Sequence, residues 1–288
     1  MCHGYWANAR QPRPWQGQLK GRGNLSITAE KSGPVPISMS VRLPKGAASP
    51  LSAADRKGGM SFPWEPRSLA RASAACVSYD IWLPADFEFA RAGRLPGLIG
   101  ADAAGQDSFA ARLLWRPGGG GAASLRTLSA GESRQPTLGM EAFEFPRGQW
   151  FKIEQEVVLN TPKQANGKLV VWIDGRMVGE RSDLVFRTHA SVAVTGVAAD
   201  VFYGGDDAAT IVPKDATVRL SPFESCAGRS ISPGLGRQGT AARPLLDTFA
   251  DHLGNAKRPE CAQPAPSAIA VTSRQSLAST RTPSVSAC

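Results

Sequence analysis

The chain has 288 residues, of which 42% are hydrophobic and 20% charged, so it allows one large domain or two smaller ones. Its formal net charge of +9 favours an anionic partner: nucleic acid, an acidic polysaccharide or anionic lipid. The basic residues are scattered without the aromatic interleaving of nucleic-acid modules, and no apolar run approaches membrane-spanning length. We therefore expect an acidic polymer as the partner, with no nucleic acid and no membrane.

The two ends of the chain differ in composition from its middle. Residues 1–35 are rich in Gln, Pro, Arg and Gly, lack the apolar core of a secretory signal, and are expected to be poorly ordered. Residues 226–288 are rich in Ser, Ala, Pro and Thr, and are expected to be disordered apart from a candidate helix over 242–253. Residues 36–225 are the predicted folded domain.

Alternating apolar and polar residues dominate this domain. The alternation predicts strands over residues 37–43, 76–83, 109–116, 151–159, 169–173, 192–201 and 218–223. The segment 122–128 gives a weaker strand signal. Loops are expected over residues 129–140 and around the four residues Gly93, Pro96, Gly97 and Gly100.

Turn residues separate these predicted strands. Asp174-Gly175 is typical of a type I′ hairpin turn, and a returning strand is expected at Met177. No helical period of useful length occurs within 36–225. Many short strands with turns between them predict an all-β antiparallel sandwich or jelly roll.

The five cysteines show no CxxC spacing, which argues against a zinc site. Four of them lie outside or at the margin of the predicted domain. We therefore expect no disulfide framework, and Cys76 is expected to pack as a small hydrophobic residue.

Polar side chains at two places suggest function. Arg112 and Arg116 share one face of the strand 109–116, with Cα atoms about 13 Å apart, which suits two anionic groups along a linear polymer. The alternative is an ordinary solvated face. Gln155 interrupts an apolar face, so it is either a hydrogen-bonded core amide or part of a cleft.

Eight segments follow one another in an order that resembles polysaccharide lyase family 14, the alginate lyase-like domain. They are VRLPKGAASP, GGMSF, SYDIWLPADFEF, GRLPGLIG, FAARLLWR, IEQEVVLNTP, GKLVVWIDG and VFYGGDDAATIVPKDATV. The resemblance covers roughly residues 36–225. It implies a concanavalin/glucanase-like jelly roll whose concave sheet carries a cleft for a polyuronate, cleaved by β-elimination without a cofactor. It further implies an extracellular or periplasmic location, and we expect a monomer.

The resemblance also implies roles for individual side chains. Arg112 matches the basic strand of the family and is expected to neutralise the uronate carboxylate, with Gln155 assisting. Tyr203 is the expected acid or base, and Lys214 is expected to bind substrate or tune Tyr203. Otherwise Tyr203 and Lys214 are a turn aromatic and a surface lysine. The remaining expected substrate-binding residues are Arg94, Arg116 and Arg126.

Two positions depart from the family pattern. Arg94 stands where the family has lysine, and arginine holds an anion but carries protons poorly. The segment AASLRTLS stands where the family has a tyrosine-rich strand, which leaves Arg126 as its long polar side chain. His189 is a further candidate base, with an exposed loop histidine as the alternative.

Three functions follow from this reading. The first is a lyase that cleaves alginate or another polyuronate. The second is a non-catalytic module that binds acidic carbohydrate on the same fold. The third is glycoside hydrolysis, which needs two carboxylates about 5–10 Å apart. Glu154 and Glu156 have a suitable same-face spacing, although their pattern is typical of a solvated face.

Overall fold

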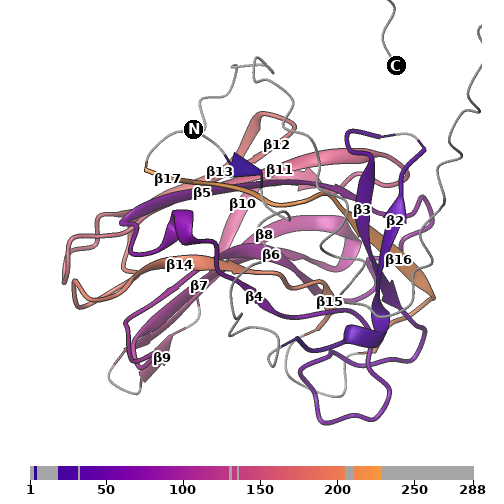
Figure 1. Ribbon diagram of the computed structural model, residues 1–288, viewed down its shortest axis with the longest axis horizontal. Coiled ribbons are helices and arrows are strands. Elements are labelled where there is room, and N and C mark those ends of the chain that lie inside the picture. Colours follow the sequence, from indigo (N-terminus) through magenta and orange to yellow (C-terminus); the bar gives the residue numbers. More distant parts are fainter. Residues whose placement is uncertain are drawn as a thin grey trace, which may run out of the picture.

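A computed structural model describes residues 3–4, 19–31, 33–129, 132–134, 136–204 and 211–228 of the chain. These residues form two antiparallel β-sheets stacked face to face (Figure 1), which confirms the expected all-β sandwich. The helical elements in this part are single 3-10 turns: η2 (Arg22–Asn24), η3 (Arg67–Leu69) and η4 (Pro117–Gly119). Within these ranges no helix has the length and apolarity that crossing a membrane requires.

Nine of the described strands form the first sheet. Its main path runs in the order β13-β12-β11-β5-β16-β3-β2, with β17 beside β5 and β1 beside β17. The strands are β1 (His3–Gly4), β2 (Leu25–Ala29), β3 (Ile37–Leu43), β5 (Ala74–Trp82), β11 (Trp150–Val158), β12 (Gly167–Ile173), β13 (Arg176–Leu184), β16 (Ala216–Leu220) and β17 (Glu224–Ala227).

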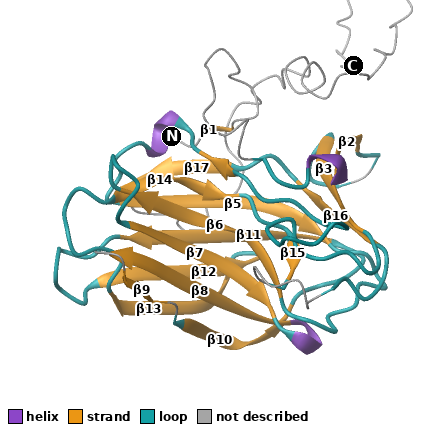
Figure 2. Ribbon diagram, turned by 90° about the horizontal axis from the view of Figure 1, so that it is seen from below, coloured by secondary structure: helices purple, strands orange, loops and turns teal. Residues whose placement is uncertain are grey.

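The other eight described strands form the second sheet, which Figure 2 shows from its own side of the sandwich. The order is β10-β8-β7-β6-β14-β4, with β9 beside β8 and β15 beside β6. The strands are β4 (Pro63–Trp64), β6 (Gly93–Ala101), β7 (Ser108–Trp115), β8 (Gly120–Ser129), β9 (Glu132–Arg134), β10 (Thr137–Glu144), β14 (Ala193–Ala198) and β15 (Phe202–Tyr203).

The alternation of apolar and polar residues correctly predicted the positions of most of these strands. β3 has the predicted bounds, and β5, β7, β11 and β12 agree to within two residues. The turn between β12 and β13 has positive φ at Asp174 (50°) and Gly175 (77°), as the type I′ prediction requires. The first sheet begins before the expected domain boundary at residue 36, because β2 pairs with β3. The candidate helix over 242–253 lies outside the described residues.

The loop predicted around residues 93–100 is wrong, because this segment is β6, a central strand. It pairs with β7 on one side and with β14 and β15 on the other. A Cβ on Gly93 would lie 1.9 Å from the Trp115 ring, and one on Gly97 would lie 2.1 Å from the Ala111 carbonyl oxygen. These glycines permit close packing within a strand. The loop expected over 129–140 is also wrong in part, since β9 and the start of β10 lie there.

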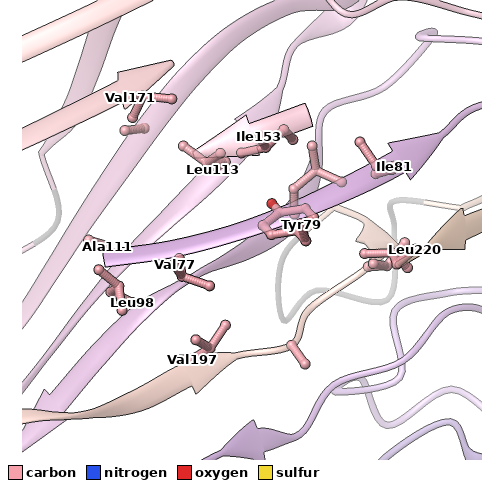
Figure 3. Packing of buried hydrophobic residues seen from close by; sticks show 14 of the residues in the cluster. Val77, Tyr79, Ile81, Leu98, Ala111, Leu113, Ile153, Val171, Val197 and Leu220 are labelled. Carbon is pink, nitrogen blue, oxygen red and sulfur yellow. The ribbon is translucent and has the colours of Figure 1, made fainter. Parts of the chain in front are cut away.

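The core lies between the sheets, where the inward residues of facing strands meet. In Figure 3, Val77, Tyr79 and Ile81 of β5 face Leu98 of β6 and Leu113 of β7. All five side chains are at most 1% exposed. The outward residues of both sheets are therefore the ones available for function.

The expectation that Cys76 packs as a lone hydrophobic residue is wrong. Cys76 of β5 and Cys226 of β17 are directly paired across the sheet and form a disulfide, with Cα atoms 5.1 Å apart. The two residues are 150 positions apart in the sequence, so spacing gave no sign of the bond. The disulfide attaches the last described strand to the middle of the first sheet.

Candidate functional site

The outer face of the eight-stranded sheet carries the predicted arginines. On β7, Arg112 points outward and is opposite Ser124 of β8, while Leu114 is opposite Arg94 of β6. Arg126 lies two residues beyond Ser124 on the same face. Arg94, Arg112 and Arg126 therefore form a diagonal row across β6, β7 and β8, with neighbouring Cα atoms about 7–8 Å apart. We call these three residues the arginine diagonal.

Arg116 extends this basic face at the end of β7. It lies two residues beyond Leu114, it is exposed, and its extended backbone leads into η4. The alternation that predicted a shared face for Arg112 and Arg116 is consistent with this placement.

The central arginine of the diagonal is held by a buried carboxylate. The Nε–H of Arg112 donates to Oδ2 of Asp200, and the two side chains are 20% and 1% exposed. Asp200 lies between β14 and β15, which both pair with β6. Asp200 is not among the predicted site residues. A lone carboxylate inside the apolar run 197–203 was nevertheless a usable signal, because a charge in such a run needs a partner.

A β-bulge in β6 lies beside Arg112 and is supported from inside the core. The register between β6 and β7 shifts just before Leu98. The Tyr79 hydroxyl donates to the Pro96 carbonyl oxygen at 3.0 Å. Gln155 accepts from the Leu98 N–H at 2.7 Å and donates to the Ala111 carbonyl oxygen at 2.8 Å. Side chains of the nine-stranded sheet thus satisfy backbone groups at and beside the bulge.

Gln155 is therefore the hydrogen-bonded core amide, and the structure contradicts its predicted role as an assistant to Arg112 in contacting substrate. It is 0% exposed and faces inward, on the opposite side of β7 from the Arg112 side chain. Its contribution to the site is indirect, because it holds β6 and β7 together where the bulge lies.

The structure also contradicts the acid or base role predicted for Tyr203. The ring is 2% exposed, stacks on Phe87 at 5.6 Å and meets the edge of Trp115 at 5.2 Å between centroids. Its hydroxyl donates to the Glu88 carbonyl oxygen at 2.6 Å. Burial, with a smaller contribution from the Glu88 charge, raises the pKa of Tyr203 well above its usual value. Tyr203 is a packed core residue.

Phe202, the neighbour of Tyr203, points to the outer face instead. It pairs with Arg94, whose guanidinium lies 5.9 Å from the centre of the Phe202 ring. At the other end of the diagonal, Arg126 is exposed and its Nε–H donates to Ser133 Oγ at 3.4 Å. Arg94 and Arg126 therefore lie on the same outer face as Arg112.

Lys214 does not join the diagonal. It is exposed and forms an ion pair with Asp86, in a contact between two surface loops. The hydrogen bond with Asp86 raises the pKa of Lys214, and the same bond lowers the pKa of Asp86. Lys214 thus matches the surface-lysine alternative.

His189 lies at the opposite end of β7 from Arg116. Its side chain is 61% exposed, and its Nε2 is 4.0 Å from Oδ2 of Asp107, the residue before β7 begins. The neighbouring Thr188 Oγ1 is hydrogen-bonded to Ser129 Oγ at 2.7 Å. This places an exposed imidazole beside the start of β7.

The two glutamates considered for hydrolysis lie on the outer face of the other sheet. Glu154 is partly exposed, whereas Glu156 is buried at 8% exposure, contrary to the expected solvated pair. Neither residue shares a surface with the arginine diagonal. Among the described residues, no group of three or more His, Cys, Asp or Glu side chains is arranged to hold a metal ion.

Two stacked antiparallel sheets with a row of guanidinium groups on one outer face define a β-sandwich protein suited to an anionic polymer. The sequence profile of the polysaccharide lyase 14 family matches residues 31–223, more than half of the chain. The protein belongs to this family and is a polysaccharide lyase. The resemblance noted from its sequence segments is confirmed.

Solved structures of similar fold include three lyases. The PL-14 alginate lyase of Aplysia kurodai has a TM-score of 0.61 and 22% identity, covering 73% of this chain and 89% of that one. An alginate lyase from Chlorella virus has a TM-score of 0.60 and 18% identity, with coverages of 73% and 91%. The endo-β-1,4-glucuronan lyase of Trichoderma reesei has a TM-score of 0.54 and 9% identity, with coverages of 78% and 93%. At these identities the likeness shows the shared jelly-roll fold.

A comparison with curated protein sequences gave no match.

Proposed function

We propose that this lyase cleaves a polyuronate, with alginate and glucuronan as the first candidates, by β-elimination along the arginine diagonal. The observation that carries the proposal is the arrangement of Arg94, Arg112 and Arg126 on one outer face, within the segment that the family profile matches. The similar structures include lyases for alginate and for glucuronan, two polymers of uronic acids. A polyuronate carries regularly spaced carboxylates, which a row of guanidinium groups complements.

The elimination needs neutralisation of one carboxylate and transfer of two protons. A guanidinium on the uronate carboxylate makes the C5 proton more acidic, because it stabilises negative charge that develops beside C5. A base removes this proton, the electron pair forms the C4–C5 double bond, and the C4–O bond breaks. The departing oxygen then takes up a proton. We assign the neutralising role to Arg112, with Arg94, Arg126 and Arg116 binding neighbouring carboxylates.

Neither Tyr203 nor His189 is placed to be this base, because Tyr203 is buried and His189 is remote from Arg112. Asp107, the partner of His189, lies five residues, about 16 Å, along the chain from Arg112. The base has to reach the C5 proton beside the carboxylate that Arg112 neutralises. A polymer that continues past Arg126 would approach the imidazole, so we assign His189 to the binding of a distant unit. A His189→Gln variant should keep kcat close to that of wild type, and a large loss of kcat would contradict this assignment.

The test uses the purified full chain with alginate, glucuronan and an uncharged glucan of the same linkage as a control. Each elimination creates a conjugated unsaturated uronate end, so ultraviolet absorbance measures the reaction directly. We expect a rise with one of the acidic polymers and none with the uncharged glucan. A flat trace from well-folded protein across a broad polyuronate panel would overturn the proposed activity.

The non-catalytic alternative predicts a different pair of results. A binding module would be retained on an affinity gel of the acidic polymer and would produce no absorbance change. Loss of gel retention in Arg112→Ala would then still locate binding at the diagonal.

A further inference from the structure

We propose that Asp200 is a positioning residue that fixes the orientation of the Arg112 guanidinium for the substrate carboxylate. This inference rests on the proposed function, because it assigns Arg112 to the reacting uronate. Asp200 itself is 1% exposed and is not placed to touch a polymer, so it would act through Arg112.

The first observation is the geometry of the ion pair. Among the described residues, Asp200 contacts Arg112 through Nε, whereas the exposed Arg181 donates to Asp183 from both Nε and Nη2. A guanidinium is planar and rigid, so fixing the direction of its Nε–H also limits the direction of its two terminal nitrogens. Those terminal nitrogens form the fork that grips a carboxylate.

The second observation is that Asp200 is anchored on both sides along the backbone. The Ala199 N–H donates to the Phe62 carbonyl oxygen at 2.8 Å. Val201 and Met60 exchange two backbone hydrogen bonds, each 3.0 Å long. The flanking side chains of Ala199 and Val201 are fully buried in the core. A carboxylate held in this way has a fixed position, so it can hold the long and flexible side chain of Arg112 in one orientation.

The third observation is the space beside Arg112. A Cβ on Gly97 would lie 2.8 Å from the Arg112 Cα and 2.1 Å from the Ala111 carbonyl oxygen, so glycine is required there. The bulge that contains Gly97 is the one supported by Tyr79 and Gln155. The strand segment beside Arg112 therefore has no side chain at Gly97 and is held in place by hydrogen bonds. The carboxylate of Asp200 then fixes the direction of the Arg112 side chain.

The chain offers a matched control on its other outer face. Arg219 Nη1 donates to Glu30 Oε2 at 2.7 Å, with side chains 26% and 3% exposed, so this pair resembles Arg112–Asp200 in type and burial. It lies on the nine-stranded sheet and has no place in the proposed reaction. Loss of a buried carboxylate partner can thus be compared at both positions.

The experiment measures kcat and KM by absorbance for the full-length wild type, Asp200→Asn, Arg112→Lys and the double variant. We expect Asp200→Asn to lower kcat/KM on the order of 10²-fold, because the guanidinium is misplaced by ångströms rather than removed. Arg112→Lys keeps the charge but lacks the Nε–H, and should lose a similar factor. The double variant should lose little more than either single variant, since both changes act on the same contact: Asp200→Asn removes the negative charge of the acceptor, and Arg112→Lys removes the Nε–H donor.

Two further measurements separate positioning from general loss of structure. Glu30→Gln should lower the unfolding temperature as Asp200→Asn does, but leave kcat/KM within about twofold of wild type, as expected for a change remote from the site. The Arg112 Nε–H resonance, identified by its absence in Arg112→Lys, should be protected from exchange in wild type and lose that protection in Asp200→Asn. This second readout needs no substrate, and it remains available if Asp200→Asn is too unstable for kinetics.

The outcomes distinguish this inference from the proposed function. Wild-type turnover with an unaffected Asp200→Asn variant would overturn the inference alone, as would equal losses of kcat/KM in Asp200→Asn and Glu30→Gln. Full additivity of the Asp200 and Arg112 changes would also overturn it. A wild type that neither cleaves nor binds any polyuronate would overturn the proposed function and the inference together.

Discussion

Arg112 and Arg219, one on each outer face of the sandwich, each pair with a buried carboxylate, and their surroundings differ. Arg219 is covered by aromatic rings, with its guanidinium 3.8 Å from the centre of Trp82 and 5.5 Å from that of Trp150. The loop between β2 and β3 closes over this cluster, because a Cβ on Gly33 would lie 2.6 Å from the Trp150 indole nitrogen. Glu30, from the same region, completes the pair with Arg219.

Arg112 has small residues beside it instead. Its neighbours across the two strand pairs are Gly97 and Ser124, and Ala110 lies on the same face of β7. The two pairs show that one interaction serves different purposes. Aromatic rings pack on Arg219 and make its pair a clasp that stabilises the fold. The side chains of Arg112 and Arg219 are similarly exposed, at 20% and 26%, so the Arg112 pair is distinguished by its place in the arginine diagonal.

Charge reinforces this contrast between the faces. The outer residues of β5, β11 and β17 include the carboxylates Asp80, Glu154, Glu156 and Glu224. Burial raises the pKa of Glu154, and the charges of Asp80, Glu224 and Asp174 raise it further while Lys152 opposes them. These carboxylates disfavour a polyuronate near Glu154, although the same face also carries the cations Lys152, Lys168 and Arg219.

The largest expected effects on activity and stability come from removing Arg112 or Arg219. Arg112→Ala should lower kcat/KM by about 10²–10³-fold, the usual effect of deleting one group that stabilises developing charge. Arg219→Ala should leave kcat/KM near wild type but destabilise the fold by about 3–5 kcal/mol, because Glu30 stays buried without its partner. Absorbance kinetics and thermal unfolding measure the two effects. Equal losses of activity in both variants, compared at a temperature where both are folded, would contradict the division between the faces.

The disulfide should affect stability and leave the reaction intact. Replacing Cys76 and Cys226 together by serine should cost about 2–5 kcal/mol of unfolding free energy, the range for a native disulfide. The bond lies on the outer side of the nine-stranded sheet, remote from the arginine diagonal, so kcat should be unchanged below the new unfolding temperature. Denaturant titration gives the stability, with reduced wild type as the matched control. A fall in kcat of the folded variant would show that the two faces are coupled.

Tyr203→Phe should produce a smaller change, and it tests whether this residue belongs to the core or to the site. The variant loses the hydrogen bond to the Glu88 carbonyl but keeps the stacked ring, so we expect a loss of about 1 kcal/mol in stability. Turnover should remain close to that of wild type. A large fall in kcat with unchanged stability would instead restore the acid or base role that the sequence suggested.

The smallest expected effect is a pH dependence at Glu154. Its folded-state pKa lies above the ordinary value of 4.5, so the folded state binds the proton more tightly than the unfolded state does. Stability therefore falls as pH rises through 4.5 and the raised folded pKa, and stays lower at neutral pH. Glu154→Gln should raise the unfolding temperature at pH 7 and have little effect well below 4.5. The opposite order in a pH series of melting curves would contradict this direction of the Glu154 pKa shift.

The sequence determined the features that depend on neighbouring residues. Period-2 alternation placed Arg112 and Arg116 on one face, gave the bounds of β3, and marked the Asp174-Gly175 turn, because side-chain direction and turn geometry follow from local backbone conformation. The glycines of β6 led to the wrong prediction of a loop, although they lie in a strand. Their role depends on Trp115 and Ala111 of the next strand rather than on β6 itself.

Tertiary structure alone decided the partners of the polar residues. Asp200 meets Arg112 across 88 positions, Cys226 meets Cys76 across 150, and Gln155 reaches backbone groups on the opposite sheet. Tyr203 belongs to a two-residue strand beside glycines, too short for alternation to assign its face. A buried polar group must find a partner, but which partner is set by strand order and sheet stacking, which bring together segments that are remote in the chain.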